Sequence, residues 1–289
     1  SIAKTISDDY ICFQVIYAAC TVVLLHFIIK ELGLKYNERC LFLFSFYCYR
    51  FLWSFWVTLR QNFANLFFWL LVIKLYKLYQ ENQKRIKKNA LLSRTKFDVL
   101  LVLTVGLPVL FHTSAYMNII LVPVLFALRK VKTRYKMTVV PLASMALYLF
   151  GGKLMGNFIR IAALIDQRYA GYVNRENSNV NVVNYVFRLL FFCLYCYFFE
   201  KNDSNLKEFV LDSSIILVLL GSINSGLMMR CYELYGIGMY AGMAYFPRYF
   251  KKSSIRLAMI IYIIGMLFIF IRYLIVMDSG AYLPYKFYW

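Results

Sequence analysis

Long runs of apolar residues, separated by short polar or basic segments, make up almost the whole chain. A helix that crosses a membrane needs roughly 20 mostly apolar residues, because the hydrocarbon core is about 30 Å thick and each helical residue rises about 1.5 Å. We expect a helix in each stretch of this character: 10–29, 41–58, 61–79, 97–112, 114–128, 137–151, 182–199, 209–229, 234–250 and 256–276. Several of these stretches are short, and 97–128 could form a hairpin that does not fully cross. The pattern predicts an all-α fold, a polytopic integral membrane helical bundle of about ten transmembrane helices.

The composition agrees with a membrane protein. Hydrophobic residues make up 62% of the 289 residues and charged residues only 16%, whereas a soluble domain is typically about half apolar and about a quarter charged. Disordered, collagen-like and disulfide-scaffold classes are excluded on the same grounds. Cys193 and Cys196 form a C-x-x-C without a second pair or a His nearby, so we expect no zinc or redox role for them. We expect 1–289 to be a single membrane domain preceded by a further N-terminal segment, because the chain begins with Ser and lacks a signal-peptide pattern.

The distribution of positive charge predicts the orientation. The net charge is +19, and most Lys and Arg residues fall in five segments that lie on one side of the ten-helix arrangement. These segments are 30–39, 77–96, 129–136, 201–207 and 248–256. By the positive-inside rule that side is cytoplasmic, and both termini lie outside. A basic loop can also bind nucleic acid or anionic lipid, but no nucleic-acid module accompanies these loops, so we expect a bilayer and no nucleic acid as partner.

A smaller group of arginines belongs to the opposite side. Its members lie in external loops or a turn or two inside the outer ends of helices: Arg60, Arg160, Arg168, Arg188, Arg230 and Arg272. Arginine is well suited to phosphate, because its planar fork donates two hydrogen bonds and stays charged. An outward cavity rich in arginine would fit a lipid-linked pyrophosphate. The alternative is that these arginines snorkel or form ion pairs, as Arg230 and Glu233 could on one helical turn.

The longest external segment, 152–181, is predicted to be a partly helical periplasmic loop. Arg160 and Arg168 are eight residues apart, slightly more than two helical turns, so both can face one cavity. Asp166, Tyr169 and Tyr172 add a carboxylate and two rings of the kind that stack on sugars. The alternative is a solvated linker, although long loops over a membrane bundle are often functional.

Three further polar points interrupt the apolar runs on the same side. Arg60-Gln61 stands between two helices, and Glu233 and Tyr235 open the ninth predicted helix. His112 lies in the turn Phe-His-Thr-Ser-Ala at 111–115, where it could accept a proton near neutral pH. The spacing of His112 and Ser114 does not by itself define a catalytic dyad, because the hydroxyl could simply cap a helix.

These pieces, in this order, resemble the EpsG-like branch of the Wzy-type polysaccharide polymerases, also called O-antigen polymerases. The resemblance is carried by Arg60-Gln61, by the 111–115 turn after a basic loop, by Arg160 in a long external loop, by Arg230 with the tyrosines that follow, and by 283–287. The His-Thr-Ser-Ala sequence after Phe111 is the most specific of these pieces.

The resemblance implies polymerisation of oligosaccharide repeat units on undecaprenyl pyrophosphate, at the periplasmic face of the bacterial inner membrane. It implies glycosyl transfer without nucleotide sugar, metal or other cofactor, and a chain-length regulator as a possible partner. We expect His112, Arg160 and Arg230 to be catalytic, with His112, Asp166 and Glu233 as alternative bases. The expected substrate-binding residues are Arg60, Gln61, Asp166, Arg168, Tyr169, Tyr172, Glu233 and Tyr235.

Other membrane functions remain as alternatives. A flippase or exporter of polyprenyl-linked glycans would also need a cationic cavity, but transporters often carry paired internal repeats, which we do not find. A membrane acyltransferase would need its His on the cytoplasmic side, and His112 is predicted outside. An accessory subunit would use the arginines only to bind anionic lipid.

Overall fold

The computed structural model describes residues 10–56, 59–86, 94–165, 182–223, 228 and 231–272. Within these ranges the chain forms helices and turns and no β-strand, which confirms the predicted all-α fold. The first part contains α2 (Tyr10–Leu32), α3 (Tyr36–Trp56), α4 (Leu59–Ile86), α5 (Arg94–Phe111), η1 (Thr113–Met117), α6 (Asn118–Leu128) and α7 (Thr133–Ile165). The second part contains α9 (Val182–Phe198), η3 (Phe199–Lys201), α10 (Lys207–Ser222), η4 (Glu233–Tyr235), α12 (Ile237–Ala244), η5 (Phe246–Tyr249) and α13 (Lys252–Arg272).

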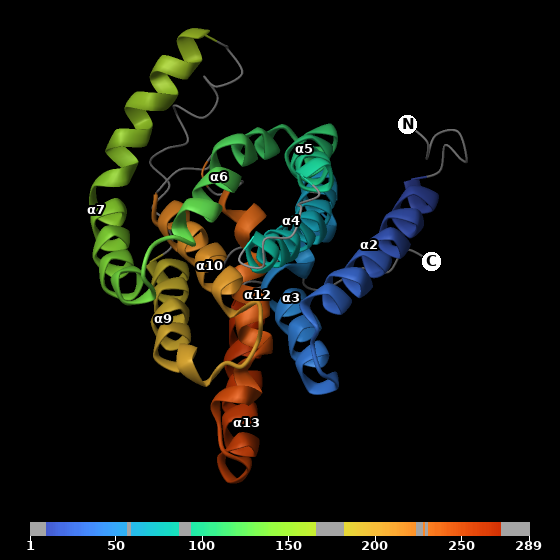
Figure 1. Cartoon of the computed structure of the whole chain (residues 1–289), viewed down its shortest axis with the longest axis vertical. Coiled ribbons are helices and arrows are strands. Elements are labelled where there is room, and N and C mark those ends of the chain that lie inside the picture. Colours follow the sequence, from blue (N-terminus) through green and yellow to red (C-terminus); the bar gives the residue numbers. More distant parts are fainter. Residues whose placement is uncertain are drawn as a thin grey trace.

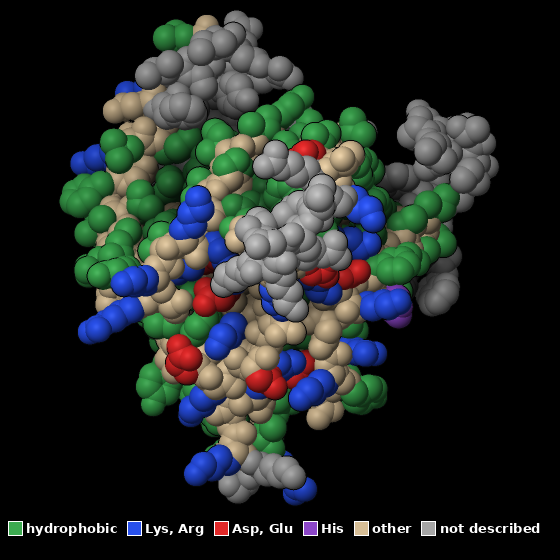
Figure 2. Space-filling view, viewed as in Figure 1, with side chains coloured by type: hydrophobic (Ala, Val, Ile, Leu, Met, Phe, Trp, Pro, Cys, Tyr) green, Lys and Arg blue, Asp and Glu red, His purple; other side chains and the backbone are tan. Residues whose placement is uncertain are grey.

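The peripheral helices have the surface of a membrane protein. Three stretches are long and apolar enough to cross a bilayer: Val15–Leu32, Thr133–Asn157 and Ser254–Arg272. Their large apolar side chains face outward, as shown by Leu142, which is 71% exposed, and Phe268, which is 64% exposed. Hydrophobic side chains cover the left and upper margins of the face in Figure 2, where α7 and α6 lie in Figure 1. Such a surface is stable against lipid, so the chain is a membrane protein, while a total of ten spans stays a prediction.

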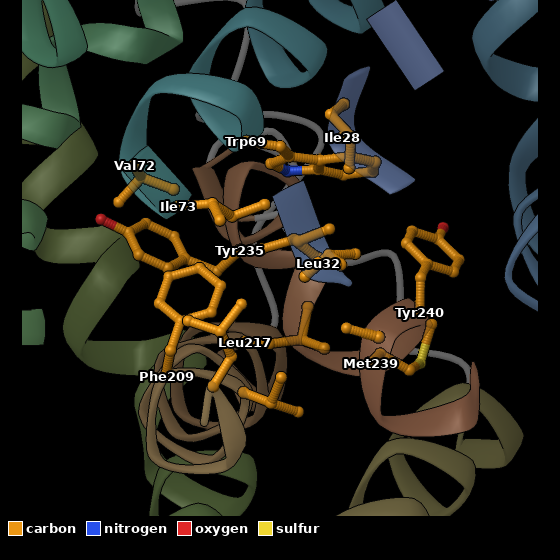
Figure 3. Packing of buried hydrophobic residues seen from close by; sticks show 14 of the residues in the cluster. Ile28, Leu32, Trp69, Val72, Ile73, Phe209, Leu217, Tyr235, Met239 and Tyr240 are labelled. Carbon is orange, nitrogen blue, oxygen red and sulfur yellow. The ribbon is translucent and has the colours of Figure 1, made fainter. Parts of the chain in front are cut away.

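The core lies between α2, α4, α10 and α12 (Figure 1). Figure 3 shows Ile28 and Leu32 of α2 close to Trp69 of α4, with Tyr235 and Tyr240 alongside. Every residue of α12 is buried, and α4 buries side chains along most of its length. A helix surrounded by other helices can carry polar residues inside a membrane, because its neighbours satisfy them. The central position of α4 therefore allows it to carry functional groups.

The prediction of one continuous spanning helix over 234–250 is wrong. The structure has α12 with only eight residues there, between the 3₁₀ turns η4 and η5, and eight helical residues extend only about 12 Å. A Cβ atom on Gly238 would lie 2.6 Å from the backbone nitrogen of Ser214, so the backbones of α12 and α10 are in direct contact. Pro247 lies in η5, at the end of this segment. Tertiary packing, rather than the apolar run, decides the local structure.

The helix expected over 137–151 continues much further than predicted. The helix α7 runs from Thr133 to Ile165, which corresponds to about 50 Å at 1.5 Å per residue, and Figure 1 shows it extending beyond its neighbours at the upper left. The first half of the expected loop at 152–181 is therefore helical and continuous with a membrane helix. Residues 166–181 lie outside the described ranges.

The basic segments are linked to one another by ion pairs. The Arg248 guanidinium donates from Nε to Glu38 Oε1 at 2.7 Å and from Nη2 to Glu38 Oε2 at 2.9 Å, and it also contacts Asp203. The Arg248 charge holds the pKa of the Asp203 carboxyl below its usual value. These contacts join three segments: the first turn of α3, which contains Glu38; the residues before α10, which include Asp203; and η5, which contains Arg248. We call this end of the bundle the basic end.

We expect Gly238→Ala to destabilise the protein, because the new methyl group would overlap the backbone of Ser213 and Ser214 in α10. Overpacking of this kind costs about 1–3 kcal/mol or more when backbone must move. Gly265→Ala in α13 is the matched control, since a Cβ there meets nothing within 4 Å and alanine favours a helix. Thermal unfolding in detergent should give a lower midpoint for Gly238→Ala and no decrease for Gly265→Ala. Equal midpoints would contradict the close approach of α12 and α10.

Candidate functional site

Buried amide side chains occupy the first turns of α4, at the end opposite the basic end. Gln61 and Asn62 are each only 1% exposed. Gln61 Nε2 donates to Glu233 Oε2 at 2.5 Å, and Asn62 Nδ2 donates to the Tyr17 hydroxyl at 2.6 Å. A buried amide without a partner is costly, so these hydrogen bonds determine where α2 and the segment at 233 sit against α4.

Glu233 brings a carboxylate into this buried region. It is 5% exposed and opens η4. The indole Nε1 of Trp69 donates to the carbonyl oxygen of Leu234 at 2.8 Å, which fixes η4 against α4. Gln61 and Glu233 are 172 residues apart in the chain. The sequence singled out both residues, and the structure brings them into direct contact.

Arg188 places a cation beside the same segment. It is 3% exposed, and its Nη2 donates to the carbonyl oxygen of Gly221 at 2.6 Å. The guanidinium carbon lies 4.7 Å from the centre of the Tyr232 ring, a cation–π distance. A Cβ on Gly221 would lie 2.9 Å from Arg188 Nε, so a larger residue at this position would displace the guanidinium. We call Gln61, Asn62, Arg188, Tyr232 and Glu233 the polar layer.

Three residues of the polar layer, Asn62, Arg188 and Tyr232, are not predicted from the sequence as site residues. The sequence indicates Arg188 only as one of six arginines on the outer side and predicts no catalytic or binding role for it. Asn62 and Tyr232 directly adjoin selected residues, and their roles depend on partners from other helices. The signal that could have found Arg188 is the cost of a charged group in a spanning helix, which implies a partner within the bundle.

The His112 turn packs close to the start of α4. Phe111, the last residue of α5, stacks on Phe67 at 5.0 Å and on Phe63 at 5.7 Å between ring centres. His112 is the N-cap of η1 and accepts a hydrogen bond from the Ser114 backbone N–H at Nδ1, at 3.2 Å. The Ser114 hydroxyl lies 2.8 Å from the same nitrogen. With Nδ1 acting as an acceptor, the neutral ring carries its proton on Nε2 and is a hydrogen-bond donor there.

Two other predicted site residues have clear positions. Arg160 lies on the last turns of α7 and is exposed, and the described part of the chain shows no contact between its side chain and the polar layer. Tyr235 is 1% exposed and packs against Phe68 at 5.3 Å between ring centres. In this arrangement Tyr235 supports the packing of η4, and a role in substrate binding stays a prediction.

The remaining predicted site residues lie outside what the structure describes. They are the Arg60 side chain, Asp166, Arg168, Tyr169, Tyr172 and Arg230. Within the described ranges, no three His, Cys, Asp or Glu side chains come together as a group that could hold a metal ion.

Comparison with known proteins gives the family. The sequence model of the EpsG family matches residues 1–287. The chain belongs to the EpsG family. Comparisons with curated proteins and with solved structures gave no match to this EpsG-family chain. Family membership confirms the resemblance seen in the sequence and supports, in general terms, a glycosyltransferase-like polysaccharide polymerase in a membrane.

Proposed function

We propose that this EpsG-family protein polymerises oligosaccharide repeat units carried on undecaprenyl pyrophosphate, at the periplasmic face of the bacterial inner membrane. The observation that carries the proposal is the polar layer. In it, Gln61 holds the buried carboxylate of Glu233, and the preceding residue, Tyr232, contacts the buried guanidinium of Arg188. This layer lies at the end of the bundle opposite the basic end, the side that the positive-inside rule assigns to the outside.

The proposed reaction transfers the growing chain to the next lipid-linked unit. A hydroxyl oxygen at the non-reducing end of the acceptor unit attacks the anomeric carbon of the donor chain and forms the new glycosidic bond. The bond between that carbon and the pyrophosphate oxygen breaks, and undecaprenyl pyrophosphate leaves with the electron pair. The hydroxyl proton passes to a base in the protein. The balance therefore requires a proton acceptor and stabilisation of negative charge on the leaving group.

The described residues suit these two requirements. The Glu233 carboxylate can take the proton, and the hydrogen bond from Gln61 fixes its orientation. His112 suits donation from Nε2 to a substrate oxygen better than proton abstraction, because its Nδ1 is occupied by Ser114. Arg188 contributes a fixed positive charge, and we propose Arg160 with Arg60, Arg168 and Arg230 for the pyrophosphate. Glu233 thus replaces His112 as our preferred base.

The proposal predicts that Arg160→Ala causes single lipid-linked units to accumulate and long chains to disappear. Removing a charge that stabilises a leaving group typically lowers the rate by about a hundredfold or more. Expression should be unchanged, because the Arg160 side chain is exposed and its loss opens no cavity. Gel electrophoresis of the lipid-linked glycans would show the change as a loss of the chain-length ladder.

Lys153→Ala is the matched control for this experiment. Lys153 is an exposed cation on the same helix, two turns before Arg160, and its replacement should leave the ladder intact. Arg230→Ala should reproduce the effect of Arg160→Ala. Normal ladders from both arginine variants would refute the proposed pyrophosphate site, whereas units retained on the cytoplasmic side would indicate a flippase.

A further inference from the structure

A cavity with a different character lies at the basic end. It has a volume of about 480 Å³ and opens between the C-terminal part of α4, the turn that joins α6 to α7, and Asn205. Three of its lining side chains are cations, Lys84, Arg129 and Lys130, and the remaining lining residues are Tyr79, Gln80, Gln83 and Asn205. A volume of this size falls in the range of sites that bind small molecules.

The positive charge in the cavity is only partly neutralised. Lys84 and Lys130 are exposed, and within the described ranges neither forms an ion pair with an acid. Arg129 Nη1 lies 3.9 Å from Glu208 Oε2. Glu208 is also 3.7 Å from Lys136, so one carboxylate is shared between two cations. The cavity therefore carries excess positive charge and favours an anion.

The walls of the cavity are held by contacts that do not depend on a ligand. Gln80 Nε2 donates to the carbonyl oxygen of Asn205 at 3.0 Å, which joins α4 to the segment before α10. Tyr79, a lining residue, packs against Phe126 at 5.0 Å between ring centres. The Arg129 guanidinium lies over the Tyr76 ring, 5.3 Å from its centre. Basic loops that only determine membrane topology do not need side chains held in fixed positions. A binding site gains affinity from such fixed side chains, because less ordering is required when the ligand binds.

This cavity is separate from the proposed donor site. Gln61 and Lys84 stand at opposite ends of α4, about 35 Å apart at 1.5 Å per helical residue. A pyrophosphate bound near the polar layer cannot reach the cavity. Any ligand of the cavity must approach from the side of the basic loops.

We propose that the cavity binds a phosphorylated ligand at the cytoplasmic face. The fork of Arg129 and the ammonium groups of Lys84 and Lys130 hold the phosphate oxygens. The amides of Gln80 and Gln83 and the ring of Tyr79 contact the rest of the ligand. The phosphate belongs either to a water-soluble molecule or to an anionic lipid headgroup, since both present the same group to these cations.

The test measures binding of inorganic pyrophosphate to the full chain in nanodiscs of phosphatidylcholine, by isothermal titration calorimetry. We expect Lys84→Gln/Lys130→Gln to weaken binding by about tenfold or more, because two charge-assisted hydrogen bonds are lost. Lys251→Gln is the matched control, since it removes an exposed cation at the same end and should leave the Kd unchanged. Pyrophosphate bound at the polar layer would be unaffected by either variant, so only the component that depends on Lys84 and Lys130 reports on the cavity.

A second measurement separates the two sources of phosphate. The chain is purified from mixed nanodiscs of phosphatidylglycerol and phosphatidylcholine, and the retained lipid is identified by mass spectrometry. Enrichment of phosphatidylglycerol that the double variant loses and Lys251→Gln keeps indicates a lipid headgroup. Pyrophosphate binding with these variant effects but without lipid enrichment indicates a soluble ligand. The proposal is overturned if the double variant matches the wild type in both measurements, or if the wild type binds neither probe.

Discussion

Lys136→Met is expected to cause the largest loss of stability of any single substitution proposed for this protein. Lys136 Nζ lies 2.6 Å from Asp212 Oδ1, and the two side chains are only 1% and 0% exposed. Methionine has a similar length but no charge, so the substitution leaves the Asp212 carboxylate buried without its cation. Breaking a buried pair in this way costs about 3–5 kcal/mol. The midpoint of thermal unfolding in detergent should fall well below that of the wild type.

Asp212→Leu in the Lys136→Met background should recover most of this loss. Replacing both members of a buried ion pair by apolar residues is often neutral or stabilising, because no charge then remains to be desolvated. Arg134→Met is the matched control: it removes an exposed cation from the same helix and should change the midpoint little. If the double variant is as unstable as Lys136→Met, the ion pair is not the source of the effect.

The burial of Lys136 illustrates what the sequence could not provide. The sequence places Lys136 in the basic segment 129–136, after four other basic residues and before the helix expected over 137–151. Its partner lies 76 residues away in α10, so the pair exists only once α7 and α10 are packed together. Local charge patterning correctly indicated a basic end but could not show which of its cations is buried.

The helices themselves were largely predictable, and the exceptions have physical causes. Apolar length predicted helices such as α2 and α13, because in lipid the backbone must satisfy its own hydrogen bonds. The region of α12 is equally apolar, yet it is a short helix between 3₁₀ turns. The contact between Gly238 and Ser214 that accompanies this structure joins two distant segments. Hydrophobic patterning shows that a segment lies in an apolar environment, but it does not show which other helix the segment packs against.

The sequence predicts individual residues of the candidate site but not which of them contact one another. The sequence predicts both Gln61 and Glu233 as substrate-binding residues, but nothing in it indicates that their side chains form a hydrogen bond. His112 was preferred as the base because imidazole titrates near neutral pH. The hydrogen bond from the Ser114 backbone to Nδ1 changes this interpretation, since it depends on the geometry of the turn.

Glu233→Gln is expected to abolish chain elongation while leaving the fold intact. The Gln61 amide can donate to the carbonyl oxygen of the new side chain as it does to the carboxylate, so the contact between α4 and η4 persists. An amide does not accept the proton of the attacking hydroxyl, and loss of a general base typically lowers a rate by about 10²–10⁴-fold. Transfer between purified lipid-linked repeat units, followed over time in detergent, measures this rate directly.

Two further variants distinguish the role of Glu233 from that of its neighbours. Gln61→Ala removes one hydrogen bond to the carboxylate but keeps the carboxylate itself, so it should lower the rate less than Glu233→Gln. It should also lower the unfolding midpoint, because a buried hydrogen bond is lost. His112→Asn removes the Nε2 donor, and we expect an intermediate loss of rate with the pH dependence of the wild type retained. The opposite order, with His112→Asn inactive and Glu233→Gln close to wild type, would identify His112 as the base. In that case the hydrogen bond from the Ser114 backbone N–H to Nδ1 must break when substrate binds, so that Nε2 can accept the proton.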